Sequence, residues 1–219
     1  MQTRGVLQEE LNKLRRELTL MASRVEEDLG KALAMLRSGG EELAEEVKES
    51  GKIVDALQHR IEDMALVLIA TQQPKARDLR ELITVFKITT NLERIGDYGI
   101  HLAKVAAKLS DRPSFRSMER IERMAEAGQE MLKAAFNAYL VQDADAARKV
   151  AILDDKIDEE HKALTEEVLA FMKEKPRLVK AAARILRLSG YMERLGDHIT
   201  NICEGVIYIT EASHEELNY

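Results

Sequence analysis

Two acidic motifs of almost the same sequence stand 100 residues apart in this chain. The first, NLERIGDYGIH, spans residues 91–101, and the second, YMERLGDHITN, spans residues 191–201. Each motif has a glutamate and an aspartate four residues apart and a glycine directly before the aspartate: Glu93, Gly96 and Asp97 in the first copy, and Glu193, Gly196 and Asp197 in the second. On a helix this spacing places both carboxylates on one face, where they repel each other. The pattern therefore predicts a compensating cation over each acidic pair.

The glycine and the arginine of each motif allow further predictions. A glycine inside a helix costs about 1 kcal/mol relative to alanine. Because both motifs carry one, we expect Gly96 and Gly196 to lie where a neighbouring helix approaches closely. Arg94 and Arg194 offer a simpler compensation than a metal, because each could pair with the aspartate three residues further on.

A third acidic pair, Asp154 and Asp158 in the segment LDDKIDEEH, has the same spacing of four residues. An antiparallel neighbouring helix could bring this pair against Glu193 and Asp197. Four facing carboxylates cannot all stay ionised without a cation between them. Such oxygen ligands suit iron, manganese, magnesium or calcium, and zinc also accepts them. We therefore predict a metal site in the second half, with further candidate ligands close by in sequence: Asn201, Glu204, His161 and His198.

The first half offers a poorer acidic set. We pair Gly51 with Asp154 and Asp55 with Asp158, so that one carboxylate is replaced by glycine. Lys104 stands where the second half has Glu204, and it could itself neutralise an acid. The sequence predicts a weaker site in this half, formed by Asp55, Glu93 and Asp97.

Apolar residues recur in steps of three and four along the whole chain, which predicts helices throughout. They mark six helices, at about residues 7–36, 43–68, 76–109, 115–135, 144–171 and 178–209. The expected breaks are Ser38-Gly39-Gly40, the segments around Pro74 and Pro176, and residues 110–113. The predicted fold class is all-α, with two tandem three-helix bundles at residues 1–110 and 111–219.

Composition narrows the classes of function. The net charge of −6 argues against general nucleic-acid binding, which needs a basic surface. A single cysteine, Cys203, excludes an internal disulfide and fits a reducing compartment. The first 18 residues contain no apolar run typical of a signal peptide, and the longest apolar run, residues 64–70, is too short to span a membrane. We therefore expect a cytoplasmic protein without direct membrane insertion.

The ordered set of motifs resembles the PhoU family of phosphate-signalling regulators. The resemblance rests on ERIGD and ERLGD, on QPKARDLR at residues 73–80, on LDDKID at residues 153–158 and on GDHITNICE at residues 196–204. It implies two three-helix bundles with paired acidic motifs, which in some members bind multinuclear iron or zinc clusters. The acidic pairs carried over are Glu93/Asp97, Asp154/Asp158 and Glu193/Asp197; iron or zinc is expected ahead of manganese.

The resemblance also implies a role without catalysis. Members of the family link the phosphate ABC transporter, through its ATPase subunit, to a sensor histidine kinase, and they repress the phosphate-starvation response when phosphate is plentiful. We expect a homodimer that reaches the inner face of the membrane only through these partners. Two alternatives stay open: a metal-dependent carboxylate-bridged enzyme, and a helical scaffold without metal. No Ser/His/Asp set, P-loop or GxGxxG fingerprint supports the enzyme.

Overall fold

The computed structural model describes residues 2–38, 42–107 and 116–218, and every regular element within these ranges is a helix. The first half consists of α1 (Gln2–Ser38), α2 (Glu42–Gln72) and α3 (Arg77–Ala106). The second half consists of α4 (Arg116–Val141), α5 (Ala144–Ala151), α6 (Asp154–Glu174), a 3₁₀ turn (Pro176–Leu178) and α7 (Val179–Glu211). The predicted fold class, all-α with two tandem three-helix bundles, is confirmed.

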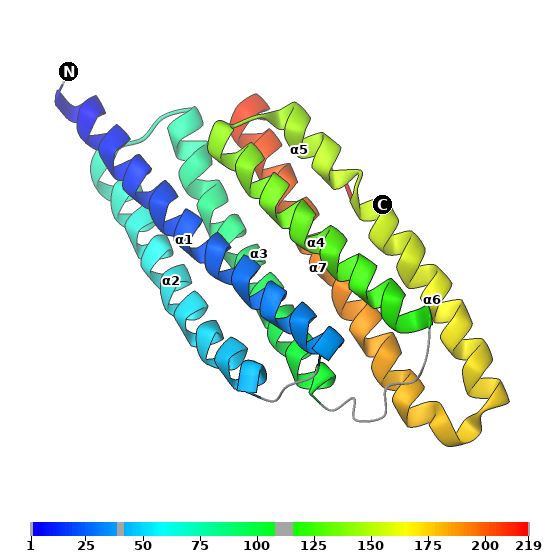
Figure 1. Ribbon diagram of the computed structural model, residues 1–219. Coiled ribbons are helices and arrows are strands. Elements are labelled where there is room, and N and C mark those ends of the chain that lie inside the picture. Colours follow the sequence, from blue (N-terminus) through cyan, green and yellow to red (C-terminus); the bar gives the residue numbers. More distant parts are fainter. Residues whose placement is uncertain (1, 39–41, 108–115, 219) are drawn as a thin grey trace.

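The two halves lie side by side with their long helices roughly parallel to one axis (Figure 1). Helices α3 and α7, which carry the two acidic motifs, pack against each other at the centre. Helix α3 also packs on α1 and α2, whereas α7 packs on α4, α5 and α6. The fold therefore places both motifs on the two central helices.

The predicted proline breaks occur where expected. Helix α2 ends two residues before Pro74, and α6 ends two residues before Pro176. Gln73 has a φ of 47°, so the chain leaves α2 through a left-handed residue. The other two predicted breaks, at residues 39–40 and 110–113, lie outside the described residues, as does the expected start of the fourth helix at Phe115.

The prediction of one continuous helix at residues 144–171 is wrong. The segment divides into α5 and α6 at Ile152 and Leu153, and the Ile152 side chain is exposed. Asp154 and Asp155 occupy the first turn of α6, where the positive end of the helix dipole favours carboxylates. No glycine or proline marks this break, so the usual sequence signals of a helix end are missing.

A buried polar network ties the halves together. Glu81 on α3 is 1% exposed, and its two oxygens accept hydrogen bonds from Arg15 Nε and Nη2 on α1 at 2.6 and 2.7 Å. Gln142, directly after α4, donates to the same carboxylate from Nε2 at 3.0 Å. A buried carboxylate is tolerated when it is paired and hydrogen-bonded in this way. The network therefore fixes the first half against the end of α4.

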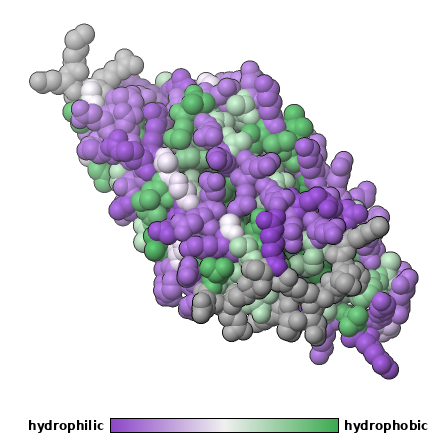
Figure 2. Space-filling model, in the orientation of Figure 1, coloured by the Kyte–Doolittle hydropathy of each residue, from purple (hydrophilic) through white to green (hydrophobic). Residues whose placement is uncertain are grey.

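The surface carries both hydrophilic and apolar side chains. Figure 2 shows hydrophilic residues over most of the face in view, with separate apolar patches between them. None of the described helices combines the length and the apolar character needed to cross a bilayer.

Candidate metal centre

Helices α6 and α7 run antiparallel and bring the second-half acids together. Asp154 lies against Gly196, whereas His161, two turns further along α6, contacts Ser189, which lies earlier on α7. Between these two levels, the charge of Asp158 acts on Glu193. The pairing of α6 with α7 that the sequence predicted is therefore present.

Asp154 is the most buried member of this acidic set, with 7% of its surface exposed. Its Oδ2 accepts a hydrogen bond from Thr200 Oγ1 at 3.2 Å, whereas its Oδ1 is buried without a hydrogen-bond partner. A Cβ atom at position 196 would lie 1.9 Å from this Oδ1. Glycine at 196 thus makes room for the carboxylate, and the predicted close approach at Gly196 is confirmed.

The four acids disfavour one another's ionisation. Burial, with the nearby charge of Asp158, raises the pKa of Asp154 to about 7. Burial is also the first cause of a raised pKa at Asp158, at Glu193 and at Asp197, and the charge of Asp197 raises the pKa of Asp158 and Glu193 further. A cation bound here would stabilise the ionised forms of all four groups.

The other candidates for the second-half site divide into two groups. The charge of His161 opposes the rise in pKa at Asp158 and Glu193, so this imidazole lies with the acids. His198 instead faces α3, because its Nδ1 lies 2.8 Å from Asn91 Oδ1, an atom that also accepts a hydrogen bond from Asn201. Glu204 accepts a hydrogen bond from the Leu217 backbone N–H at 2.9 Å. Only His161 among these four therefore joins the acidic set.

The first-half acids also approach one another. Burial raises the pKa of Glu93, and the charges of Asp97 and Asp55 raise it further. The opposing cation is Arg94, whose Nε lies 3.5 Å from Glu93 Oε2, while Lys104 is exposed on α3. The first half thus brings three acids together but compensates Glu93 with an arginine.

The contacts of α2 on α3 agree with the pairing of Gly51 with Asp154. Gly51 faces Ile100, which stands 100 residues before Thr200, the residue that donates to Asp154. The charge of Asp55 raises the pKa of Glu93, just as that of Asp158 raises the pKa of Glu193. The first half therefore has a glycine where the second half has its most buried acid.

The contact at Gly96 is also looser than the one at Gly196. A Cβ atom there would meet Val25 Cγ2 at 3.6 Å, an ordinary van der Waals distance. The predicted close approach is therefore found in the second half and not in the first.

The donor set of the second half fits a hard or borderline cation. It offers several carboxylates of raised pKa, one nearby imidazole and an unpartnered buried oxygen, Asp154 Oδ1. Across the described residues, no three His, Cys, Asp or Glu side chains lie close enough together as they stand to hold one ion. Coordination of one ion by three of these groups would therefore need adjustment of side chains.

Two residues of this centre were not singled out from the sequence. Thr200 is fully buried and donates to Asp154, and Ser189 is fully buried and lies 2.6 Å from His161 Nδ1. Thr200 stands four residues after Gly196 and therefore on the same helix face, which is a signal that could have indicated it.

The fold and the acidic centre together define a class: an all-helical protein of two tandem bundles, with a duplicated acidic motif on its two central helices. The model of the PhoU domain family matches residues 18–106 and 121–206, one match in each half. The chain belongs to the PhoU family.

Named relatives and solved structures agree with this membership. The phosphate-specific transport system accessory protein PhoU homolog of Clostridium acetobutylicum is 33% identical over 217 residues, which cover 99% of each chain. The homolog of the same name from Aquifex aeolicus is 34% identical, covering 92% of this chain and 91% of its own.

Two crystal structures share the fold. PhoU from Pseudomonas aeruginosa has a TM-score of 0.90 at 31% identity, covering 94% of this chain and 99% of its own. The phosphate transport system regulatory protein PhoU from Streptococcus pneumoniae has a TM-score of 0.89 at 28% identity, covering 96% and 99%. The resemblance inferred from the motifs is confirmed.

Proposed function

We propose that this chain is a regulator of phosphate transport that represses the phosphate-starvation response. In this role it is an adaptor between the ATPase subunit of the phosphate ABC transporter and a sensor histidine kinase. The observation that carries the proposal is the match of the PhoU domain to both halves, together with relatives named as accessory proteins of phosphate-specific transport. The protein acts as a homodimer at the cytoplasmic face of the membrane, where its partners hold it.

The shape of the chain suits contact with two proteins. Each half presents long helical faces, and the two halves lie side by side (Figure 1). The net charge of −6 favours basic patches on the partners and an association that weakens as salt is added. A transporter subunit and a kinase could therefore occupy different faces of one molecule.

Within this role, the second-half acids hold a divalent transition metal, iron or zinc ahead of manganese. When bound, the metal supplies positive charge between α6 and α7. Asp154, Asp158, Glu193 and Asp197 hold it, Thr200 orients Asp154, and Ser189 orients His161 beside the acids. The bound metal then keeps α6 and α7 in one arrangement, and it keeps the partner-binding face in one arrangement with them.

Metal titration of the purified protein tests directly whether the second-half acids bind the metal. The double variant Glu193→Ala/Asp197→Ala should lose more bound metal than the matched variant Glu93→Ala/Asp97→Ala, because Gly51 stands where the second half has Asp154. Equal losses would contradict the ranking of the two halves.

The adaptor role is tested by deletion of the gene in its native host, followed by measurement of phosphatase expression in high phosphate. Expression should become constitutive, and the wild-type gene should restore repression. Intact repression after deletion would overturn the proposal.

The alternative of a carboxylate-bridged enzyme draws on one observation. A pKa of about 7 at Asp154 lies in the range of a general acid or base. Because this carboxylate is 7% exposed and packed on Gly196, a substrate would have little access to it. Turnover of phosphate esters by the purified, metal-loaded protein at typical enzyme rates would favour the enzyme over the adaptor.

A further inference from the structure

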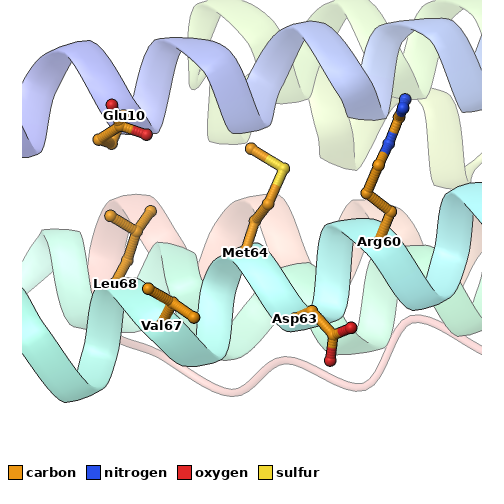
Figure 3. Close-up of a pocket in the computed structure, with 6 residues that line it drawn as sticks. All are labelled: Glu10, Arg60, Asp63, Met64, Val67 and Leu68. Carbon is orange, nitrogen blue, oxygen red and sulfur yellow. The ribbon is translucent and has the colours of Figure 1, made fainter.

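Two apolar hollows lie end to end in the groove between α1 and α2. The first has a volume of about 480 Å³, and Figure 3 shows Met64 and Leu68 rising from α2 toward α1 within it, with Glu10 at its α1 side. The second has a volume of about 390 Å³ and is lined by Leu20, Arg24, Ile53, Ala56, Leu57 and Arg60. Arg60 lines both hollows and pairs with Glu17 on α1, so this ion pair marks the middle of the groove.

The groove exposes large apolar side chains. Leu20, Ile53 and Val67 are 51%, 47% and 57% exposed, and each lines one of the hollows. Exposed apolar side chains that gather in one place, with charged residues around them, are typical of a surface that binds another protein. The groove is therefore a candidate surface for binding a protein partner.

The corresponding groove of the second half is different. Between α4 and α6, charged residues line the hollow, and Arg120 and Arg123 both pair with Glu160. The apolar groove is thus a property of the first half and not of the repeat.

The charges along the groove are arranged with opposite signs about its middle. On α1, Glu10 lies seven residues before Glu17, and Arg24 lies seven residues after it. On α2, Ile53 and Val67 lie seven residues before and after Arg60. Seven residues of helix span roughly 10 Å, so the acidic and the basic end are equally far from the central ion pair.

We propose that this groove binds a second copy of the chain in antiparallel orientation. The twofold axis lies in the plane of the interface, crosses the groove at its middle and runs perpendicular to the helices. It places α1 on the partner's α1 and α2 on the partner's α2. Arg24 of each copy then faces Glu10 of the other, and Ile53 of each copy faces Val67 of the other. Away from the axis, each contact of such an interface is made twice. At the axis, the Glu17–Arg60 pair of one copy lies over the same pair of the other, so that each charge has its opposite on the diagonal.

The contacts that Glu10 and Arg24 make within one chain compete only weakly with contacts between subunits. Glu10 contacts Lys13, and Arg24 Nη1 lies 3.5 Å from Glu27 Oε2, each within the exposed surface of one helix. Such exposed pairs contribute little to stability, so the charges are free to make contacts between subunits. This inference rests on the homodimer proposed above and specifies its interface.

The test is analytical ultracentrifugation of the full chain over a range of concentrations. We expect a dimer, and we expect Glu10→Arg and Arg24→Glu each to raise its dissociation constant by about tenfold or more, because like charges then face each other. The double variant Glu10→Arg/Arg24→Glu should restore wild-type affinity. An equimolar mixture of the two single variants should restore it too, because both contacts of the mixed dimer again join opposite charges.

Lys162→Glu, a charge reversal at an exposed position of α6, is the matched control and should leave the dissociation constant unchanged. A wild-type chain that stays monomeric would overturn the homodimer. A dimer that both single variants leave intact would overturn this interface alone. Weakening by the single variants without restoration in the double variant or the mixture would overturn the antiparallel arrangement in which Arg24 faces Glu10. None of these outcomes bears on repression by the gene, so the adaptor role is tested separately.

Discussion

The two motif helices share a sequence but differ in what lies against them. In α7, Gly196 faces the carboxylate of Asp154, which has one buried oxygen without a partner. In α3, Gly96 lies at ordinary packing distance from Val25 and Val54. The acids and the glycine of a duplicated motif can therefore persist in both halves while the neighbouring helix decides which copy has the donors of a metal site.

The pKa values of the acids also differ between the two copies of the motif, and they again favour a cation in the second half. In the second half, burial and mutual repulsion raise the pKa of four acids, that of Asp154 to about 7. In the first half, Gly51 replaces the most buried of these acids, and Arg94 opposes the charge of Glu93. We expect the second half to depend on a cation more strongly than the first.

The largest effect should come from rebuilding the second-half acids in the first half. Gly51 and Ile100 stand where the second half has Asp154 and its partner Thr200. Gly51→Asp combined with Ile100→Thr should destabilise the metal-free protein by about 3 kcal/mol, near the usual loss for an uncompensated buried charge. A divalent cation should recover much of this loss in thermal denaturation. Destabilisation that zinc or manganese leaves unchanged would mean that position 51 and the three acids of the first half do not converge on a site.

A smaller effect is expected at the two glycines. Gly196→Ala brings a methyl group into the Asp154 carboxylate and should cost roughly 1–3 kcal/mol through overpacking. Gly96→Ala fits at ordinary contact distance and should gain up to about 1 kcal/mol from helix propensity. Urea denaturation of both variants checks the difference, and an equal change in the two would contradict it.

The remaining predictions concern pH. Because the pKa of Asp154 is raised from its usual 3.8 to about 7, protonation stabilises the folded state fully below about pH 4, and this contribution is lost as the pH rises through 7. Asp158, Glu193 and Asp197 shift in the same direction, so the metal-free protein should become less stable from pH 5 to pH 8.

Asp154→Asn should flatten this pH dependence and gain roughly 1 kcal/mol at pH 8 without metal, since an amide carries no charge to desolvate. Melting temperatures in chelator at several pH values measure both quantities. A variant with the slope of the wild type would mean that Asp154 does not titrate in this range.

Much of the fold could be predicted from the sequence because its signals are local. The apolar periodicity and the prolines at 74 and 176 located the long helices and two of their ends. The break at Ile152 and Leu153 was missed because no helix-breaking residue marks it. The network of Arg15, Glu81 and Gln142 was missed because its members are brought together only by tertiary packing.

The candidate site, too, could be predicted only where its signals are local in the sequence. Spacing along α6 and α7 predicted which acids share a face, and the antiparallel packing brings them together as expected. Equivalence between the halves was predicted from the spacing of the acids, and the contact of Gly51 with Ile100 agrees with it. The contribution of Thr200 was missed because its partner lies on a different helix.

Anomalous scattering from crystals grown with iron, zinc or manganese tests the central claim most directly, because it locates a metal without any substitution. We expect a peak between α6 and α7, beside Asp154, Asp158, Glu193 and Asp197, and a weaker peak or none beside Asp55, Glu93 and Asp97. Peaks of equal height in the two halves, or a peak in the first half alone, would contradict the account.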